Sequence, residues 1–168
     1  MAAAAPPRPL EESDDRASFD CGRESVNAWL RRHGWANHRD NISRVSVSVE
    51  PGTPRIAGFV TLSASQIERG WLAKARQRGL PEQVPAALLG QLGVDVAFQG
   101  QGYAVSLLQY ALRLAVSASK EIGCAAVITH PLDDRLRAFY ARWGFQELPF
   151  DPRRAMIIRI VDMPDRFK

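Results

Sequence analysis

The sequence has little cysteine and no long apolar run. Its two cysteines, Cys21 and Cys124, could form one disulfide, but a chain of 168 residues should bury enough surface without one. Together with three scattered histidines they give no metal-ligand pattern, so we expect no metal site. The longest apolar stretches, such as 86–89 and 124–128, fall far short of the roughly 18 residues that a membrane span requires. We therefore expect a reduced protein without a transmembrane segment.

The N-terminus also lacks the pattern of a secretory leader. Residues 1–7 are rich in alanine and proline, with no basic head before an apolar run, so we expect a cytoplasmic protein. Residues 1–16 are expected to be a loose N-terminal segment that can include a first strand, and 164–168 a C-terminal tail. Because no linker or repeat divides residues 17–163, they are predicted to form a single domain.

The composition is that of an ordinary soluble globular protein. Hydrophobic residues make up 46% and charged residues 24%, which excludes disordered, collagen-like and coiled-coil classes. The 22 basic and 18 acidic residues give a net charge of +4. This balance suits a polyanionic partner, but it is also common among soluble enzymes, so it does not choose between them.

Hydrophobic periodicity and turn residues predict a mixed order of helices and strands. The predicted helices cover 23–37, 71–78, 102–119 and 133–143. The first is expected to carry Val26, Trp29, Leu30 and His33 in one apolar stripe. Asp133 or Asp134 can cap the last, and Gly144 can close it in a left-handed conformation. The predicted strands cover 43–50, 55–65, 87–96, 125–129, 146–148 and 156–161. The strand–helix–strand order around 102–119 implies a parallel pair, and the valine–serine alternation in 43–50 predicts a sheet with one solvated face. The fold class is α/β (α+β), a mixed central sheet flanked by helices.

The stretch from Leu92 to Ala104 predicts an anion-binding turn, because a buried strand there ends in glycines that open a helix. Glycines let the backbone approach a phosphate, and the N–H groups of a first helical turn attract negative charge. A Walker loop needs Gly-Lys-Ser/Thr, which is absent, and Glu121 lies near the dinucleotide spacing but ends a helix. A pyrophosphate site therefore remains, beside the alternative of a helix-initiating turn without ligand.

Two motifs resemble those of the GNAT (Gcn5-related) N-acetyltransferases. Gln99, Gly102 and Ala104 match Gln/Arg-x-x-Gly-x-Gly/Ala, the coenzyme A turn of that family. The stretch from Leu136 to Phe145 is similar to the Phe-Tyr-x-x-x-Gly-Phe helix end near the C-terminus of many GNAT enzymes. The resemblance implies the GNAT fold and acetyl-CoA as co-substrate. By periodicity alone Tyr140 would be a core tyrosine.

The resemblance also implies roles for individual residues. Tyr140 would protonate the thiolate that leaves coenzyme A, as a general acid. The strand at 92–94 would splay from its neighbour at a bulge that suits Gly93, and would offer an N–H group to the oxyanion. The residues implied to bind acetyl-CoA are Leu92, Gly93, Val94, Gln99, Gly100, Gln101, Gly102, Tyr103, Ala104 and Val105. No residue stands out as the general base.

Further stretches resemble the GNAT toxins of bacterial type II toxin–antitoxin modules. They lie at 19–22, 26–30, 58–63, 88–90 and 130–134. Those toxins acetylate the α-amine of aminoacyl-tRNA, which blocks translation, and they are homodimers silenced by a ribbon-helix-helix antitoxin. The chain departs from them at Gln91, where the family often has arginine, and at Ala104, where it commonly has glycine.

A tRNA substrate requires a basic surface, and two windows provide one. Residues 31–44 and 68–78 each hold four basic residues and one acidic residue, for a net charge of +3. The predicted nucleic-acid contacts are Arg31, Arg32, Arg69, Lys74, Arg76 and Arg78. The alternative is that these are ordinary basic residues on a solvated surface, without a nucleic-acid contact. At the level of function, acetylation of a small-molecule or protein amine and a non-catalytic CoA-binding regulatory module also remain open.

Overall fold

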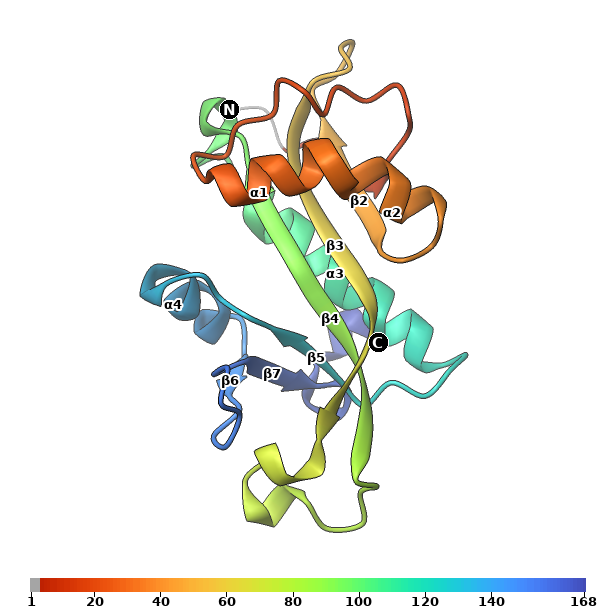
Figure 1. Cartoon of the computed structure of the whole chain (residues 1–168), viewed down its shortest axis with the longest axis vertical. Coiled ribbons are helices and arrows are strands. Elements are labelled where there is room, and N and C mark those ends of the chain that lie inside the picture. The colour runs from red at the N-terminus through yellow and green to blue at the C-terminus, as the bar shows by residue number, and fades with distance from the viewer. Residues whose placement is uncertain (1–3) are drawn as a thin grey trace. The chain divides into compact units, whose positions relative to one another are not determined.

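The computed structural model describes residues 4–168. These form two compact units, residues 4–63 with 90–111 and residues 64–89 with 112–168. The strands of the described chain pair in the order β1-β2-β3-β4-β5-β7-β6, and β3, β4 and α3 have residues in both units (Figure 1). No helix in residues 4–168 is long and apolar enough to cross a membrane.

The regular elements of the described chain follow the predicted order closely. The helices are α1 (Glu24–Trp29), α2 (Trp35–Arg39), α3 (Tyr103–Ser119) and α4 (Asp134–Arg142). The strands are β1 (Arg8–Pro9), β2 (Arg44–Val49), β3 (Ile56–Glu68), β4 (Gln83–Val94), β5 (Ala126–Thr129), β6 (Gln146–Glu147) and β7 (Met156–Arg159). These helices and strands confirm the predicted α/β class with a mixed sheet.

Antiparallel pairing of β1, β2 and β3 builds the first unit's sheet, and Phe59 lies at the centre of its core. The Phe59 ring meets Phe19 edge-on at a centroid distance of 5.3 Å and stacks on Trp29 at 6.1 Å. Aromatic pairs at such distances add to the burial of apolar area, so this cluster attaches α1 and the loop before it to β3.

The alternation in β2 does not produce a solvated face, so that expectation was wrong. Ser46 and Ser48 are buried like the neighbouring Val45 and Val47, with 4% and 0% of their surface exposed. The Ser48 hydroxyl donates a hydrogen bond to the Ala5 carbonyl at 2.9 Å. A serine can be buried at little cost when its hydroxyl has such a partner, and the sequence alone does not reveal that partner.

The first predicted helix contains a π-helical turn, Leu30–Gly34, between α1 and α2. Val26, Leu30, Gly34 and His38 are buried, four residues apart, because the wider π turn delays the return of each side chain to the core. His33, expected in the apolar stripe, is exposed instead. A Cβ at Gly34 would lie 2.9 Å from Leu30 Cδ1, so a larger residue would have to displace the end of the Leu30 side chain.

The short basic helix expected at 71–78 is absent. Two 3-10 turns, Arg69–Trp71 and Lys74–Arg76, stand there, separated by Leu72 and Ala73 in extended conformation. Leu72 is 4% exposed and belongs to the second unit's core. Burial of this leucine outweighs the weak helix preference of a short, basic segment.

Parallel pairing of β4 with β5 lies at the centre of the second unit, which confirms the predicted parallel pair. Ala86–Leu89 pairs with Ala126–Thr129, and every residue of β5 is buried. β4 begins four residues before the predicted strand and ends at Val94, because Val96 lies in a 3-10 turn, Val96–Phe98.

Candidate active site

The turn after β4 is built so that its backbone is open to a ligand. Gly100 and Gly102 have φ angles of +78° and +88°, and a Cβ at either position would meet no atom within 4 Å. The bond from Ser106 N–H to the Gly102 carbonyl, at 3.1 Å, is the first of α3, so the N–H groups of residues 103–105 precede it. The N-terminus of this 17-residue helix therefore offers backbone donors and a positive dipole end to an anion.

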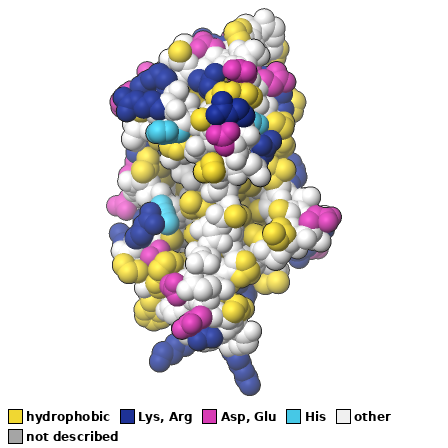
Figure 2. All heavy atoms as spheres, turned by 45° about the vertical axis from the view of Figure 1, so that its right-hand side comes forward, with side chains coloured by type: hydrophobic (Ala, Val, Ile, Leu, Met, Phe, Trp, Pro, Cys, Tyr) yellow, Lys and Arg dark blue, Asp and Glu magenta, His cyan; other side chains and the backbone are white. Residues whose placement is uncertain are grey.

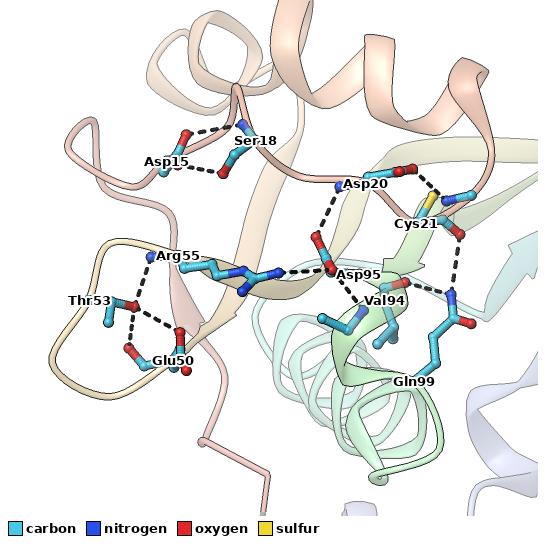
Figure 3. Close-up of polar contacts among 12 residues, drawn as sticks. Asp15, Ser18, Asp20, Cys21, Glu50, Thr53, Arg55, Val94, Asp95 and Gln99 are labelled. Carbon is cyan, nitrogen blue, oxygen red and sulfur yellow. Dashed lines mark hydrogen bonds and ion pairs between the residues drawn. The ribbon is translucent and has the colours of Figure 1, made fainter.

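A buried carboxylate, Asp95, holds the start of this turn (Figure 3). Its oxygens accept the Asp20 N–H at 3.0 Å and the Ala97 N–H at 2.9 Å, and Arg55 lies 3.5 Å away. The Asp20 carbonyl in turn accepts the Val96 N–H at 2.9 Å. Asp95 thus fastens the loop before α1 to the turn after β4.

Aromatic contacts extend this arrangement to the first residue of α3. The Arg55 guanidinium lies 5.0 Å from the centroid of the Phe98 ring, which meets the Tyr103 ring edge-on at 5.7 Å. Neither Asp95 nor Arg55 was predicted from the sequence. The only available signal was an acidic residue at the end of an apolar strand.

Gln99, the first residue of the turn motif, uses its side-chain amide inside the protein (Figure 3). Its Nε2 donates to the Val94 carbonyl at 3.0 Å and to the Cys21 carbonyl at 3.2 Å. Both amide hydrogens are therefore engaged, and Gln99 fixes the path of the turn. Its place among the acetyl-CoA contacts, through its backbone, stays a prediction.

Gly93 lies where β4 passes close to α1 and the loop before it. A Cβ there would lie 3.1 Å from Val26 Cγ1 and 3.4 Å from Cys21 Sγ, so a larger residue would require the Val26 side chain to shift. The pairing of β4 with β5 ends at Leu89 and Thr129, while β4 runs on to Val94. The backbone of 90–94 lies beyond that pairing, as a splayed strand requires.

Hydrogen bonds at both ends of α4 hold Tyr140 in place. The Asp133 carboxylate accepts the Leu136 N–H at 2.9 Å, which confirms the predicted cap. At the other end the Phe145 N–H donates to the Tyr140 carbonyl at 3.2 Å, and the Gly144 N–H to the Ala141 carbonyl at 3.1 Å. This is a Schellman motif, and Gly144, with φ of +97°, has the left-handed conformation expected of it.

The side chain of Tyr140 is buried and protonated. It is 3% exposed, and its ring meets Phe139 and Phe145 at centroid distances of 5.3 and 5.2 Å. Burial raises the pKa of the phenol to about 12, although a hydrogen bond with Thr129 acts in the opposite direction. At neutral pH Tyr140 therefore carries its proton.

His130, next to Thr129 in sequence, has an unusual environment that the sequence did not reveal. Its Nε2 is buried without a hydrogen-bond partner. Burial lowers the pKa of its imidazole, and the charge of Arg153 lowers it further. The ring is therefore neutral near pH 7. Among residues 4–168, no group of three His, Cys, Asp or Glu side chains could hold a metal ion.

Three of the six predicted nucleic-acid contacts already have partners within the protein. Arg31 pairs with Glu24 at 2.8 Å, Arg76 with Asp162 at 3.4 Å, and Arg69 donates to the Leu80 carbonyl at 2.8 Å. Within the described residues, the side chains of the other three are exposed and form no hydrogen bond or ion pair: Arg32, Lys74 and Arg78. Figure 2 shows Lys and Arg side chains protruding at its lower end, where Figure 1 places the chain between β3 and β4.

Known proteins are similar to this chain in sequence and in fold. A family model described as an acetyltransferase (GNAT) domain matches residues 53–147. A tRNA-acetylating toxin of Mycobacterium tuberculosis is 34% identical over 158 residues, which cover 94% of each protein. The crystal structure of a tyrosine-to-phenylalanine mutant of KacT is 31% identical, with a TM-score of 0.88, and covers 94% of this chain and 96% of that one.

Two further solved structures contain ligands or partners. AtaT complexed with acetyl-methionyl-tRNAfMet is 29% identical, with a TM-score of 0.84, and covers 91% of this chain and 93% of that chain. A mutant AtaT toxin bound to acetyl-CoA and to the C-terminus of the antitoxin AtaR is 27% identical, with a TM-score of 0.77 and coverage of 92% of each chain.

Proposed function

The chain belongs to the GNAT family of acetyltransferases, and we propose that it transfers the acetyl group of acetyl-CoA to the α-amine of aminoacyl-tRNA. The observation that carries the proposal is the buried, protonated phenol of Tyr140, held at the end of α4 by a Schellman motif. A group with this pKa can protonate a departing thiolate without ionising beforehand at neutral pH.

The residues predicted to contact acetyl-CoA bind and orient this co-substrate, which supplies the acetyl thioester. The backbone N–H groups from Gln99 to Val105 receive the pyrophosphate, because the two left-handed glycines open the turn and α3 directs its N-terminus there. The backbone of Leu92, Gly93 and Val94, beyond the pairing with β5, binds the pantetheine arm and gives the oxyanion an N–H donor. The neutral amine attacks, and water removes its proton.

The proposed acceptor is charged tRNA. Two findings support it: the Mycobacterium relative is named a tRNA-acetylating toxin, and AtaT has been solved in complex with acetyl-methionyl-tRNAfMet. Three exposed cations are available to the tRNA phosphates. Arg32 lies in the π-helical turn that follows α1, and Lys74 and Arg78 lie between β3 and β4. Arg31, Arg69 and Arg76 contribute through their remaining N–H groups.

The proposal extends to the biological setting. Acetylation of charged tRNA in the cytoplasm blocks translation, so the protein acts as the toxin of a toxin–antitoxin module. It is a homodimer, and a ribbon-helix-helix antitoxin silences it. The complex of AtaT with the C-terminus of AtaR supports an antitoxin partner for a chain of this family.

The test incubates the protein with labelled acetyl-CoA and a total pool of charged tRNA, and follows label into the RNA. Wild-type protein is expected to label the RNA, and Tyr140→Phe to lower kcat by roughly 10²- to 10⁴-fold, because the ring contacts remain but the acid is lost. Free amino acids and protein amines serve as competing acceptors in parallel reactions.

The other outcomes identify the competing functions. Label on a small amine or a protein, with none on RNA, would show a GNAT enzyme with a different acceptor. Binding of acetyl-CoA that is unaffected by Tyr140→Phe, without transfer to any acceptor, would leave a non-catalytic CoA-binding module.

A further inference from the structure

Hydrogen bonds at the two ends of the β3–β4 pair show that β4 has one residue more than the part of β3 beside it. At one end the Arg69 N–H donates to the Glu82 carbonyl at 2.9 Å. At the other end the Asp95 N–H donates to the Ala57 carbonyl at 2.8 Å. Asp95 lies 13 residues after Glu82, whereas Arg69 lies 12 residues after Ala57. Two residues of β4 therefore lie opposite one residue of β3 between these bonds, which is a β-bulge.

The direction of the backbone groups of β4 shows where the extra residue lies. On a regular strand, every second residue directs its N–H and C=O groups to the same neighbouring strand. The Pro85 carbonyl accepts the Ala125 N–H at 2.9 Å, so Pro85 points to the β5 side. Leu89 points to that side as well, as alternation requires, because its carbonyl accepts the Thr129 hydroxyl of β5 at 3.0 Å.

After Gly90 the alternation has changed by one residue. Gln91 would point to β5 in an unbroken strand, but its N–H donates to the Thr61 hydroxyl of β3 at 2.9 Å. A Cβ at Gly58 of β3 would lie 3.1 Å from the Gly93 carbonyl oxygen, so Gly93 points to β3 too. The bulge therefore lies at Gly90, whereas the resemblance implies Gly93.

Thr61 is placed to hold this bulge. It is 3% exposed, and its hydroxyl oxygen accepts the Gln91 N–H, the first backbone donor after the bulge. A Cβ at Gly90 would lie 3.1 Å from the same oxygen, so glycine leaves the hydroxyl room to reach the backbone. Loss of a partner is costly for a backbone N–H away from water, so this bond favours the turned orientation of Gln91.

The changed alternation determines which N–H group of β4 can meet an oxyanion. Because Gln91 and Gly93 point to β3, the Leu92 N–H between them points away from β3. The pairing with β5 ends before Leu92, so that ladder does not engage this donor. Val94 points to the same side as Leu92, and its carbonyl accepts the Gln99 side chain at 3.0 Å.

We propose that Thr61 is a positioning residue, which holds the bulge of β4 through the Gln91 N–H and so aims the Leu92 N–H at the oxyanion. When the amine attacks, the thioester carbonyl oxygen takes on negative charge, and a preorganised N–H donor stabilises it. Thr61 gives up no proton and contacts no substrate. This inference rests on the proposed acetyl transfer and names the residue among 92–94 that supplies the donor.

The first measurement records the infrared band of the acetyl carbonyl in acetyl-CoA that carries carbon-13 at this position and is bound to the protein. A hydrogen bond from Leu92 weakens the C=O bond, so the bound band is expected at a lower wavenumber than in solution. In Thr61→Val the band should move back toward its position in solution. Thr61→Ala, which removes the hydroxyl without placing a methyl group against the Gln91 N–H, should move it in the same direction. Thr61→Ser should match wild type.

The second measurement compares kcat, and KM for acetyl-CoA, with the acceptor that the wild-type protein acetylates. Thr61→Val should lower kcat by roughly 10- to 100-fold, less than the about 10²- to 10³-fold effect of losing an oxyanion donor, because the Leu92 N–H is displaced and not removed. KM for acetyl-CoA should change little, and Thr61→Ser should restore kcat to within a few fold. Ser48→Ala removes another buried hydroxyl and should leave the band and kcat unchanged.

The infrared band separates positioning of the donor from a merely structural effect. A fall in kcat of Thr61→Val without a shift of the band would overturn the proposal, and so would an unchanged kcat. A wild-type band at its position in solution would overturn the roles of Leu92 and Thr61 together.

The band needs no acceptor, so it also separates this inference from the proposed function. Wild-type protein that binds no acetyl-CoA would overturn both. The expected shifts in a protein that acetylates an amine other than charged tRNA would overturn the proposed acceptor and support the role of Thr61.

Discussion

At the scale of single residues, buried polar groups are held in defined protonation states by their hydrogen bonds. His38 is 7% exposed, and its Nδ1 accepts the Val45 N–H at 3.0 Å, so that nitrogen carries no proton. Burial lowers the pKa of His38, and the charge of Arg44 lowers it further. Protonation of the ring would replace this acceptor with a donor facing another N–H group.

We predict that His38 makes folding stability sensitive to mild acid. Its pKa is lower in the folded chain than the ordinary value of 6.5, so the unfolded chain binds the proton first and stability falls as pH falls below that value. Thermal unfolding at about pH 7.5 and about pH 5.5 measures the effect. The decrease in Tm should be smaller in His38→Asn, whose side-chain oxygen can accept the Val45 N–H without titrating.

The matched control is His33→Asn, because His33 is exposed on the same helical segment. It should show the same decrease in Tm as wild type. A decrease in His38→Asn equal to that of wild type would assign the acid sensitivity to other groups, of which His130 is the first, since burial lowers its pKa too.

At the scale of elements, the ligand-facing turn depends on a carboxylate that itself stays inside the protein. Asp95 accepts N–H groups from the loop before α1 and from the 3-10 turn after β4. Asp14 is a close counterpart: its side chain is also 3% exposed, pairs with an arginine, Arg8, and accepts a backbone N–H, from Glu11 at 2.8 Å. Only Asp95 contacts the turn that opens α3.

We predict that Asp95→Asn weakens acetyl-CoA binding by roughly five- to tenfold, because an amide NH2 would replace one carboxylate oxygen and release one of the two N–H groups. Isothermal titration with acetyl-CoA measures the change in Kd. Asp14→Asn should lower Tm in a similar way but leave Kd unchanged. Equal Kd values in the two variants would mean that Asp95 contributes to stability without shaping the turn.

At the scale of the whole molecule, the distribution of charge matters more than its total. The net charge of +4 is small, and many arginines are neutralised by neighbouring carboxylates. Lys74 and Arg78 are exposed and unpaired within the described residues, in the segment between β3 and β4. This segment can therefore present its charge to a polyanion at full strength.

We predict that Lys74→Glu raises KM for charged tRNA several-fold and leaves KM for acetyl-CoA unchanged, since a phosphate contact becomes a repulsion. Lys120→Glu changes the net charge equally at another exposed lysine and should have little effect. The difference between the variants should shrink as salt is raised. A similar rise in KM in both variants would indicate that only total charge matters.

The parts predicted from the sequence depend on residues close together in the chain. The glycine turn at 100–102, the cap at Asp133 and the helix end at Gly144 are local patterns, and all three are present. The contacts that escaped prediction join distant residues, as Asp20 with Asp95 and Gln99 with Cys21. The predictions of a solvated face on β2 and of a helix at 71–78 were wrong for the same reason. Packing within the folded protein determines the burial of the β2 serines and of Leu72.

The closure of α4 bears on how related sequences are interpreted. The spacing between Tyr140, Gly144 and Phe145 is fixed by backbone hydrogen bonds and a ring contact at 5.2 Å, none of which involves the phenol oxygen. During divergence, selection for a folded chain alone would preserve the glycine and the second aromatic residue. A homologue that has lost acetyltransferase activity is therefore expected to keep the glycine and the second aromatic residue. Phenylalanine in place of the tyrosine is the substitution that would distinguish it.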